Sequence, residues 1–145
     1  MKASIERVDA DSLDVDEVLG VYRDSGLGAR RPIEDRARFT LMLRNANLVV
    51  TARVDTVLIG IARSVSDFSY VTYLSDIAVA ERYQRNGLGR ALIAATQREA
   101  PDAKIVLLSA PAATGYYPHI GFTAHGSAWV LEAGRDPTRL VPASR

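Results

Sequence analysis

The sequence contains no cysteine, which excludes disulfide bonds, thiol nucleophiles and thiolate metal sites at once. It also has only two histidines, and no pattern of carboxylates accompanies them, so we expect no metal. Long apolar runs are missing too. No segment approaches the roughly 20 apolar residues that a membrane span needs, and no apolar stretch follows the charges near the first methionine. These absences predict a cytoplasmic protein without a membrane partner.

An excess of either charge is also missing. Lysine and arginine number 18 against 17 acidic residues, so the net charge of +1 gives no long-range field that would attract nucleic acid. A small-molecule ligand is the better expectation. The length of 145 residues and the hydrophobic content of 48% suit one core. We expect a single domain over residues 1–145 whose tail is loosely ordered from about Arg135.

The spacing of apolar residues predicts an alternation of helices and strands. Apolar residues three and four apart predict helices from Leu13 to the glycine at 26, from Ile33 to Arg44 and from Gly87 to Ala100. β-Branched and apolar runs predict strands at 5–8, 48–53, 57–65, 70–79 and 105–109, then a short helix at 112–119 and a last strand pair around 122–131.

The order of these elements predicts the topology of the sheet. Short connections between the three strands at 48–79 predict an antiparallel meander. The strand, helix and strand from 70 to 109 predict a parallel pair with a right-handed crossover. The continuous apolar run at 105–109 is typical of a central strand covered on both faces. The fold class is therefore α/β.

One turn has the composition of an anion site. Between the strand ending at Val79 and the helix beginning near Gly87, the chain reads Gln84-Arg85-Asn86-Gly87-Leu88-Gly89-Arg90. A helix N-terminus leaves backbone N–H groups without partners and carries a partial positive charge. The glycines let the main chain approach a phosphate, and the arginines add charge-assisted hydrogen bonds. The turn lacks both the Lys-Ser or Lys-Thr pair of a Walker turn and the three glycines of the dinucleotide fingerprint.

Three segments together resemble the GNAT superfamily of acyl-coenzyme A-dependent N-acetyltransferases. They are Asp76-Ile77-Ala78-Val79, the turn from Gln84 to Gly89, and Tyr116-Tyr117-Pro118-His119-Ile120-Gly121-Phe122. The turn matches the family's (Gln/Arg)-x-x-Gly-x-(Gly/Ala) pattern. The third segment matches its aromatic-Tyr-x-x-x-Gly-Phe pattern, although Pro118 departs from the charged residue common there. The resemblance spans about Leu48 to Leu131 and implies a mixed sheet of about six to seven strands, helices on both faces and a splayed central parallel pair.

The resemblance implies acetyl-coenzyme A (acetyl-CoA) as the acyl donor. The pantetheine arm is expected to bond the backbone of the strand ending at Val79, and the diphosphate to lie on the N–H groups of the glycine turn. Ser109 stands where the family often has a hydrogen-bonding residue at the end of the fifth strand. The residues implied in cofactor binding are Ile77, Ala78, Val79, Gln84, Arg85, Asn86, Gly87, Leu88, Gly89, Arg90, Ser109 and Tyr116.

The implied reaction is direct attack of a primary amine on the thioester. An alkyl amine with a pKa near ~10 is mostly protonated at neutral pH, so it must first lose a proton. Asp76 is the leading candidate for the base, provided that an apolar neighbourhood raises its pKa. Alternatively, Asp76 points away from the cleft and serves a structural hydrogen bond, and Ser75 and Tyr73 hold a water on the opposite face. Tyr117 is implied as the acid that protonates the departing thiolate, with Tyr116 as the alternative phenol.

The acceptor is expected to be a small-molecule or peptide amine, whose identity the sequence leaves open. Arg30 and Arg31 lie beside the expected acceptor entrance, where they either attract an acidic group of the substrate or form a solvated loop. A domain that holds acetyl-CoA as a sensor without turnover is the alternative function. The small net charge disfavours an aminoacyl-tRNA acceptor. The last strands are candidate edges for pairing, so we expect a homodimer.

Overall fold

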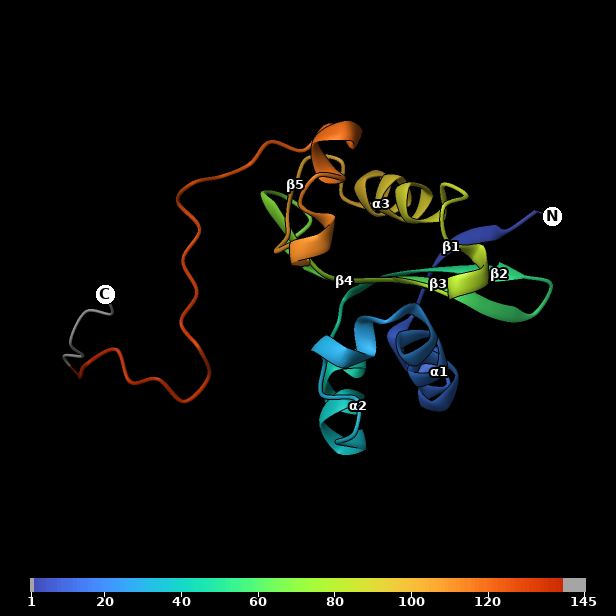
Figure 1. Ribbon diagram of the computed structural model, residues 1–145, viewed down its shortest axis with the longest axis horizontal. Coiled ribbons are helices and arrows are strands. Elements are labelled where there is room, and N and C mark those ends of the chain that lie inside the picture. The colour runs from blue at the N-terminus through green and yellow to red at the C-terminus, as the bar shows by residue number, and fades with distance from the viewer. Residues whose placement is uncertain (1, 140–145) are drawn as a thin grey trace. The chain divides into compact units, whose positions relative to one another are not determined.

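The computed structural model of the chain describes residues 2–139 (Figure 1). These residues fall into two units, which divide between Ser109 and Ala110. The first unit holds a β-sheet and its covering helices. The second consists of short 3₁₀ turns and extended chain.

The first unit contains five strands and three α-helices. The strands are β1 (Ser4–Val8), β2 (Leu48–Val54), β3 (Val57–Ser66), β4 (Val71–Val79) and β5 (Lys104–Val106). The helices are α1 (Val15–Ser25), α2 (Arg36–Arg44) and α3 (Leu88–Glu99), with 3₁₀ helices at Ala10–Ser12, Leu27–Arg30 and Glu81–Tyr83. The predicted order of elements is confirmed through β5.

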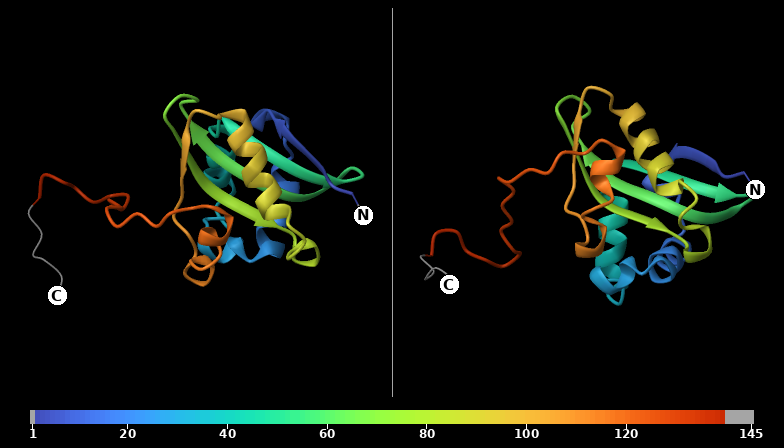
Figure 2. Two further views of the ribbon diagram at one scale, coloured as in Figure 1. Left: turned by 90° about the horizontal axis from the view of Figure 1, so that it is seen from above. Right: turned by 45° about the horizontal axis from the view of Figure 1, so that its top comes forward.

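The strands form one mixed sheet in the order β1-β2-β3-β4-β5. The first three pairings are antiparallel, and β4 pairs with β5 in parallel. Helix α3 covers one face of the sheet, whereas α1 and α2 lie against the other face (Figures 1 and 2). The expected meander, the parallel pair and the helices on both faces are therefore confirmed.

The expected six to seven strands are not reached in the described residues. Residues 122–131 form no strand, so the predicted last strand pair is wrong, and the predicted helix at 112–119 is replaced by two 3₁₀ helices, Pro111–Ala113 and Tyr117–Ile120. The polar sequence His125-Gly126-Ser127 interrupts the apolar run, and a lone pair of such short segments is marginal without a sheet to join. The predicted loose tail falls in part on residues 140–145, which lie outside the described residues.

The predicted central strand at 105–109 is also wrong. Strand β5 ends at Val106, and two of its three side chains, Lys104 and Val106, are exposed. In the described part of the chain β5 has a strand neighbour on one edge only, so it lies at the edge of the sheet. An apolar run alone does not distinguish a central strand from a short edge strand.

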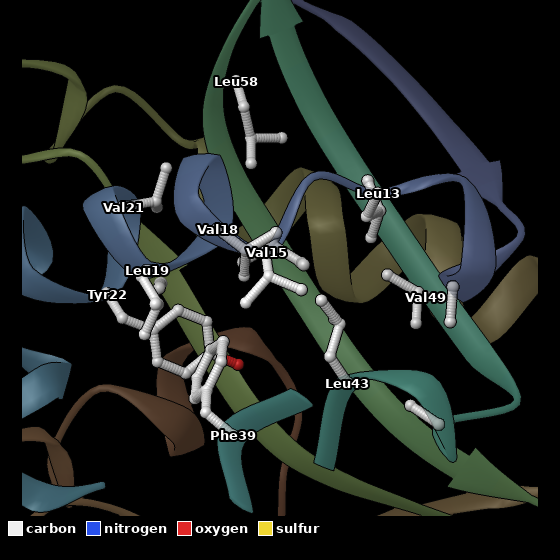
Figure 3. Close-up of a cluster of buried hydrophobic side chains, with 14 of the residues drawn as sticks. Leu13, Val15, Val18, Leu19, Val21, Tyr22, Phe39, Leu43, Val49 and Leu58 are labelled. Carbon is white, nitrogen blue, oxygen red and sulfur yellow. The ribbon is translucent and has the colours of Figure 1, made fainter. Parts of the chain in front are cut away.

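The core between the sheet and α1 and α2 holds this unit together (Figure 3). Helix α1 begins after Asp14, whose side chain accepts hydrogen bonds from the first-turn N–H groups, and buries an apolar face built at helical spacing. The rings of Tyr22 and Phe39 meet edge to face with centroids 4.9 Å apart, and both side chains are fully buried. This contact joins α1 to α2.

We expect Phe39→Ala to lower the free energy of unfolding by about 3–5 kcal/mol, because it leaves a cavity against Tyr22. Leu41→Ala on the same helix is the matched control. Leu41 is 64% exposed, so its truncation is expected to change stability by about 0.5 kcal/mol or less. Urea unfolding measures both variants. Equal losses for the two would contradict this assignment of the core.

Candidate active site

The carboxylate of Asp76, in β4, is buried and occupied on both oxygens. Its Oδ2 accepts hydrogen bonds from the Tyr22 hydroxyl and from Arg63 Nε, each at 2.6 Å. Its Oδ1 accepts from Arg31 Nε at 2.6 Å and from Ser75 Oγ at 3.3 Å. The Asp76 side chain is 0% exposed. One carboxylate thus ties α1, the α1–α2 connection, β3 and β4 together.

These contacts set the protonation states of the cluster. Burial by itself would raise the pKa of Asp76, but the ion pairs and hydrogen bonds from Arg63, Tyr22 and Arg31 hold it below its usual value. Burial and the neighbouring carboxylate raise the pKa of Tyr22 well above its usual value, so this phenol is neutral. Asp76 is consequently ionised at neutral pH.

The sequence predicts Asp76 as the base only if an apolar neighbourhood raises its pKa. In the structure the pKa of Asp76 is lowered instead, and both carboxylate oxygens already accept hydrogen bonds. The alternative expectation, that Asp76 serves a structural hydrogen bond, describes the geometry. The Asp76 carboxylate therefore holds α1, the α1–α2 connection and β3 against β4, and the identity of the base stays a prediction.

Strand β4 is irregular beside this cluster. Arg63 of β3 pairs with Asp76, but the next residue, Ser64, pairs with Leu74, so Ser75 is an extra residue on β4. The Ser75 carbonyl accepts a hydrogen bond from the guanidinium of Arg31 at 2.8 Å. The bulge thus lies where the α1–α2 connection contacts the sheet.

Beyond the bulge, one edge of β4 has no strand partner in residues 2–139. The parallel ladder with β5 covers only Val71 to Tyr73. Ala80 N donates to Ile59 O at 2.8 Å, and antiparallel bonding alternates along a strand, so the main-chain groups of Ala78 face β3. Those of Ile77 and Val79 face the open edge. The parallel ladder thus ends well before β4 does, and of the three residues expected to bond the pantetheine arm through the main chain only Ile77 and Val79 present main-chain groups to the open edge.

The glycine turn follows β4 after the 3₁₀ helix Glu81–Tyr83. Gly87 has φ 80°, a left-handed conformation that favours glycine, and it precedes α3 without a side-chain cap. The helical ladder begins with Ala91 N donating to Gly87 O at 3.0 Å. The N–H groups of Leu88, Gly89 and Arg90 therefore point out of the first turn, as an anion site requires.

Two contacts tie the turn to neighbouring elements. Gln84 Nε2 donates to Val79 O at 2.8 Å and to Ser25 O, at the end of α1, at 3.3 Å. Glu81 N donates to the Asp24 carboxylate at 2.9 Å. The Gln84 side chain therefore links the turn to β4 and α1, and its main-chain N–H donates to Glu81 O at 3.1 Å, so neither group is left for a ligand.

Tyr116 and Tyr117 belong to the second unit and are described within it. The Tyr117 ring packs edge to face on Tyr116, with centroids 5.3 Å apart, and on Phe122, at 5.4 Å. Burial and the neighbouring Tyr116 raise the pKa of Tyr117. The phenol is thus protonated at neutral pH, as a proton donor must be. Ser109, the last residue of the first unit, lies three positions beyond β5.

Residues 21–135 match the family model described as an acetyltransferase (GNAT) domain. The chain belongs to the GNAT acetyltransferase family. Comparison with curated proteins gives no match.

Solved GNAT structures share the fold. A GNAT-family acetyltransferase from Streptococcus pneumoniae TIGR4 is 20% identical, with a TM-score of 0.69 over 90% of this chain and 98% of that one. A probable acetyltransferase from meticillin-resistant Staphylococcus aureus is 18% identical, with a TM-score of 0.71 over 90% and 100%. An aminoglycoside N-acetyltransferase in complex with CoA is 18% identical, with a TM-score of 0.68 over 92% and 96%.

Sequence reasoning missed the arginines of the Asp76 cluster. Arg63 stands in the middle of a β3 run that is otherwise apolar or small, and a lone charge in such a run is a usable signal of a buried partner. Arg31 was noted only for the entrance. Nothing in its local sequence indicates that the α1–α2 connection of this GNAT protein folds back onto β4, since that contact spans 45 positions.

Other features of the described chain lie apart from this site. A hollow of ≈ 400 Å³ is lined by Arg7, Val8, Asp9, Ala10, Ala46 and Asn47, and the strand register puts it at the end of the sheet opposite the glycine turn. Residues 2–139 contain no group of three or more potential metal-ligating side chains. No helix in the same residues is long and apolar enough to cross a bilayer.

We expect Asp76→Asn to lower the free energy of unfolding at pH 7 by about 3–5 kcal/mol, because the buried Arg63 and the partly buried Arg31 lose their counter-ion. Its acid sensitivity changes as well. Because its pKa is lower in the folded than in the unfolded protein, Asp76 contributes stability that is fully present above the unfolded value near ~3.9 and is lost as the pH falls below it. The variant lacks this contribution, so it loses less stability than the parent on acidification below about pH 4.

Urea unfolding at pH 7 and at several pH values below 4 measures both effects. Asp16→Asn is the control, because the Asp16 side chain is 77% exposed and its ion pair with Arg36 is worth about 1 kcal/mol or less. A variant as stable as the parent at pH 7 would show that the Asp76 cluster does not hold the fold.

Proposed function

We propose that the protein transfers the acetyl group of acetyl-CoA to a primary amine by direct attack on the thioester. The observation that carries this proposal is the succession of two features: the open edge of β4 at Ile77 and Val79 is followed, after the 3₁₀ helix Glu81–Tyr83 and the glycine turn, by the uncapped N-terminus of α3. An extended arm on the edge and a diphosphate at its end match the shape and charge of CoA. The GNAT family and a neighbour solved with CoA support this choice of cofactor.

The binding roles follow from the free groups of the first unit. The pantetheine amides pair with the main chain of Ile77 and with the N–H of Val79, whose carbonyl is held by Gln84. The diphosphate lies on the N–H groups of Leu88, Gly89 and Arg90. The exposed arginines of the turn add positive charge around it.

The proton steps use groups other than Asp76. Ser75 Oγ accepts from Arg63 and donates to Asp76, so it too is engaged. The amine therefore loses its proton to water. Tyr73, which is 39% exposed on β4, is the remaining residue that is predicted to hold this water. Tyr117, whose pKa is raised, donates a proton to the thiolate of CoA after the carbon–sulfur bond breaks.

The acceptor class is a small-molecule or peptide amine. Support comes from neighbours that share the fold, among them aminoglycoside acetyltransferases at 18–19% identity, one of them solved with sisomicin. These neighbours support an amine acceptor in general. The charge around the α1–α2 connection bears on which amine it is.

Gly89→Ala tests the cofactor site without straining the fold. Gly89 is not among the residues with positive φ and stands in the first turn of α3, where alanine is tolerated. We expect acetyl-CoA affinity to fall about tenfold or more, because a Cβ keeps the diphosphate from a charge-assisted bond worth about 1.5–3 kcal/mol.

Calorimetric titration with acetyl-CoA measures this affinity, and Gly20→Ala is the control, since nothing lies within 4 Å of a Cβ at that exposed helical glycine. Unchanged affinity in Gly89→Ala would remove the diphosphate from this turn. Absence of binding by the parent would overturn the proposed function, and binding without CoA release on any amine would favour a sensor.

Tyr117→Phe tests the acid. We expect kcat to fall about 10²-fold or more while the acetyl-CoA affinity stays within about twofold, because the phenol acts only when the thiolate leaves. Thiol release gives kcat, and calorimetry gives the affinity. Tyr70→Phe is the matched control, because Tyr70 is a 66% exposed phenol outside the site, and it is expected to keep most activity. A fully active Tyr117→Phe protein would remove this residue from the mechanism.

A further inference from the structure

The cluster at the β4 bulge holds two arginines on one carboxylate. Arg31 and Arg63 both form ion pairs with Asp76 at 2.6 Å, and no other ion pair in the described residues includes either arginine. Tyr22 is neutral because its pKa is raised. The cluster therefore carries one positive charge in excess.

Dipoles offset this charge only in part. Arg63 NH1 donates to Met42 O at 3.1 Å, in the last turn of α2, where a helix presents about half a negative charge. Arg31 NH1 donates to the carbonyl of its neighbour Arg30 at 2.9 Å. A charge buried without a full counter-ion is unfavourable, so the cluster favours a second anion.

Arg31 is the member of the cluster that a ligand can reach. Its side chain is 20% exposed, against 10% for Arg63. A guanidinium has five N–H donors, and the contacts of Arg31 with Asp76, Ser75 O and Arg30 O use three of them. The remaining two can bind a carboxylate, and the bonds to Asp76 and Ser75 fix the guanidinium in place.

The position of Arg31 relates it to the reaction. Its NH2 lies 2.8 Å from the carbonyl of Ser75, two residues before Ile77 on the open edge of β4. The connection that carries it has four arginines and two acidic residues between 26 and 38. Both acids are exposed, and Asp35 caps α2. This charge is unfavourable to a polycation and favourable to an acid.

We propose that Arg31 selects acceptors in which a carboxylate accompanies the amine, as in a free amino acid. The carboxylate binds the spare N–H groups of Arg31, and the amine extends toward the open edge of β4. Asp76 acts on this step through Arg31, whose guanidinium it holds against the strand. This inference rests on the proposed function and names the class of its acceptor.

Matched pairs of amines that differ only in the carboxylate test the inference. Phenylalanine is compared with 2-phenylethylamine, and lysine with 1,5-diaminopentane, by CoA release at saturating acetyl-CoA. We expect kcat/KM to be about tenfold or more higher for at least one carboxylate-bearing member over its partner, with the difference mainly in KM. Equal values, or a preference for the partner lacking the carboxylate, would overturn the inference.

The variant Arg31→Gln tests whether Arg31 causes the preference for the carboxylate. This variant leaves Asp76 paired with Arg63 alone, so the cluster becomes neutral and keeps one ion pair. The preference for the carboxylate should fall to about twofold or less, while the calorimetric affinity for acetyl-CoA stays that of the parent. Arg30→Gln is the control, because it removes the same charge from the exposed neighbour. An unchanged preference in Arg31→Gln would overturn the inference.

Different results would refute the proposed function and the proposed acceptor class. If acetyl-CoA does not bind, or no amine of the panel releases CoA, the proposed function fails and the acceptor class fails with it. If amines are acetylated without regard to the carboxylate, the function stands and only the role of Arg31 fails. Should Arg31→Gln not fold, as thermal unfolding would show, the comparison of paired amines with the parent protein still decides the question.

Discussion

The architecture of the first unit depends on the burial of one ionised carboxylate. Asp76 accepts hydrogen bonds from a helix, from the connection that follows that helix, and from the adjacent strand. No apolar contact could impose the same direction on three elements, because dispersion forces are not directional, whereas charge-assisted hydrogen bonds are. Removing the carboxylate leaves Arg31 and Arg63 charged and poorly solvated. The α1–α2 connection is therefore held against β4 at a defined position.

The open edge of β4 is a consequence of strand length. Strand β4 has nine residues and β5 has three, so the parallel ladder stops well before β4 ends. A parallel strand that continued alongside would occupy the main-chain groups of Ile77 and Val79. Because no strand continues there, the carbonyl of Ile77 and the N–H groups of Ile77 and Val79 stay unpaired in a row. Further along the chain, the first N–H groups of α3 are also free. A site for an extended, anionic ligand thus arises from what the backbone leaves unpaired.

Much of this fold was predictable from the sequence, and the exceptions have physical causes. Helix α3 and the β2–β3 hairpin follow from periodicity and turn residues, which are local properties. The strand pair expected at 122–131 failed because β propensity cannot supply a neighbouring strand. The glycine turn was predictable because the left-handed conformation at Gly87 favours glycine, and that residue can be read directly from the sequence. The partners of Asp76 were not, since Tyr22 and Arg31 lie 54 and 45 positions away from it.

The same long-range contacts alter the proton chemistry that the sequence suggested. An aspartate on a strand beside a thioester is a reasonable base only if it is poorly paired. Here two guanidiniums lower its pKa, and they also act on whatever approaches the bulge. Under the proposed reaction, the proton of the amine therefore goes to water rather than to Asp76. The positive charge that the cluster carries in excess is the charge that an acceptor carboxylate on Arg31 balances, so the Asp76 carboxylate that holds Arg31 in place leaves it able to bind the substrate.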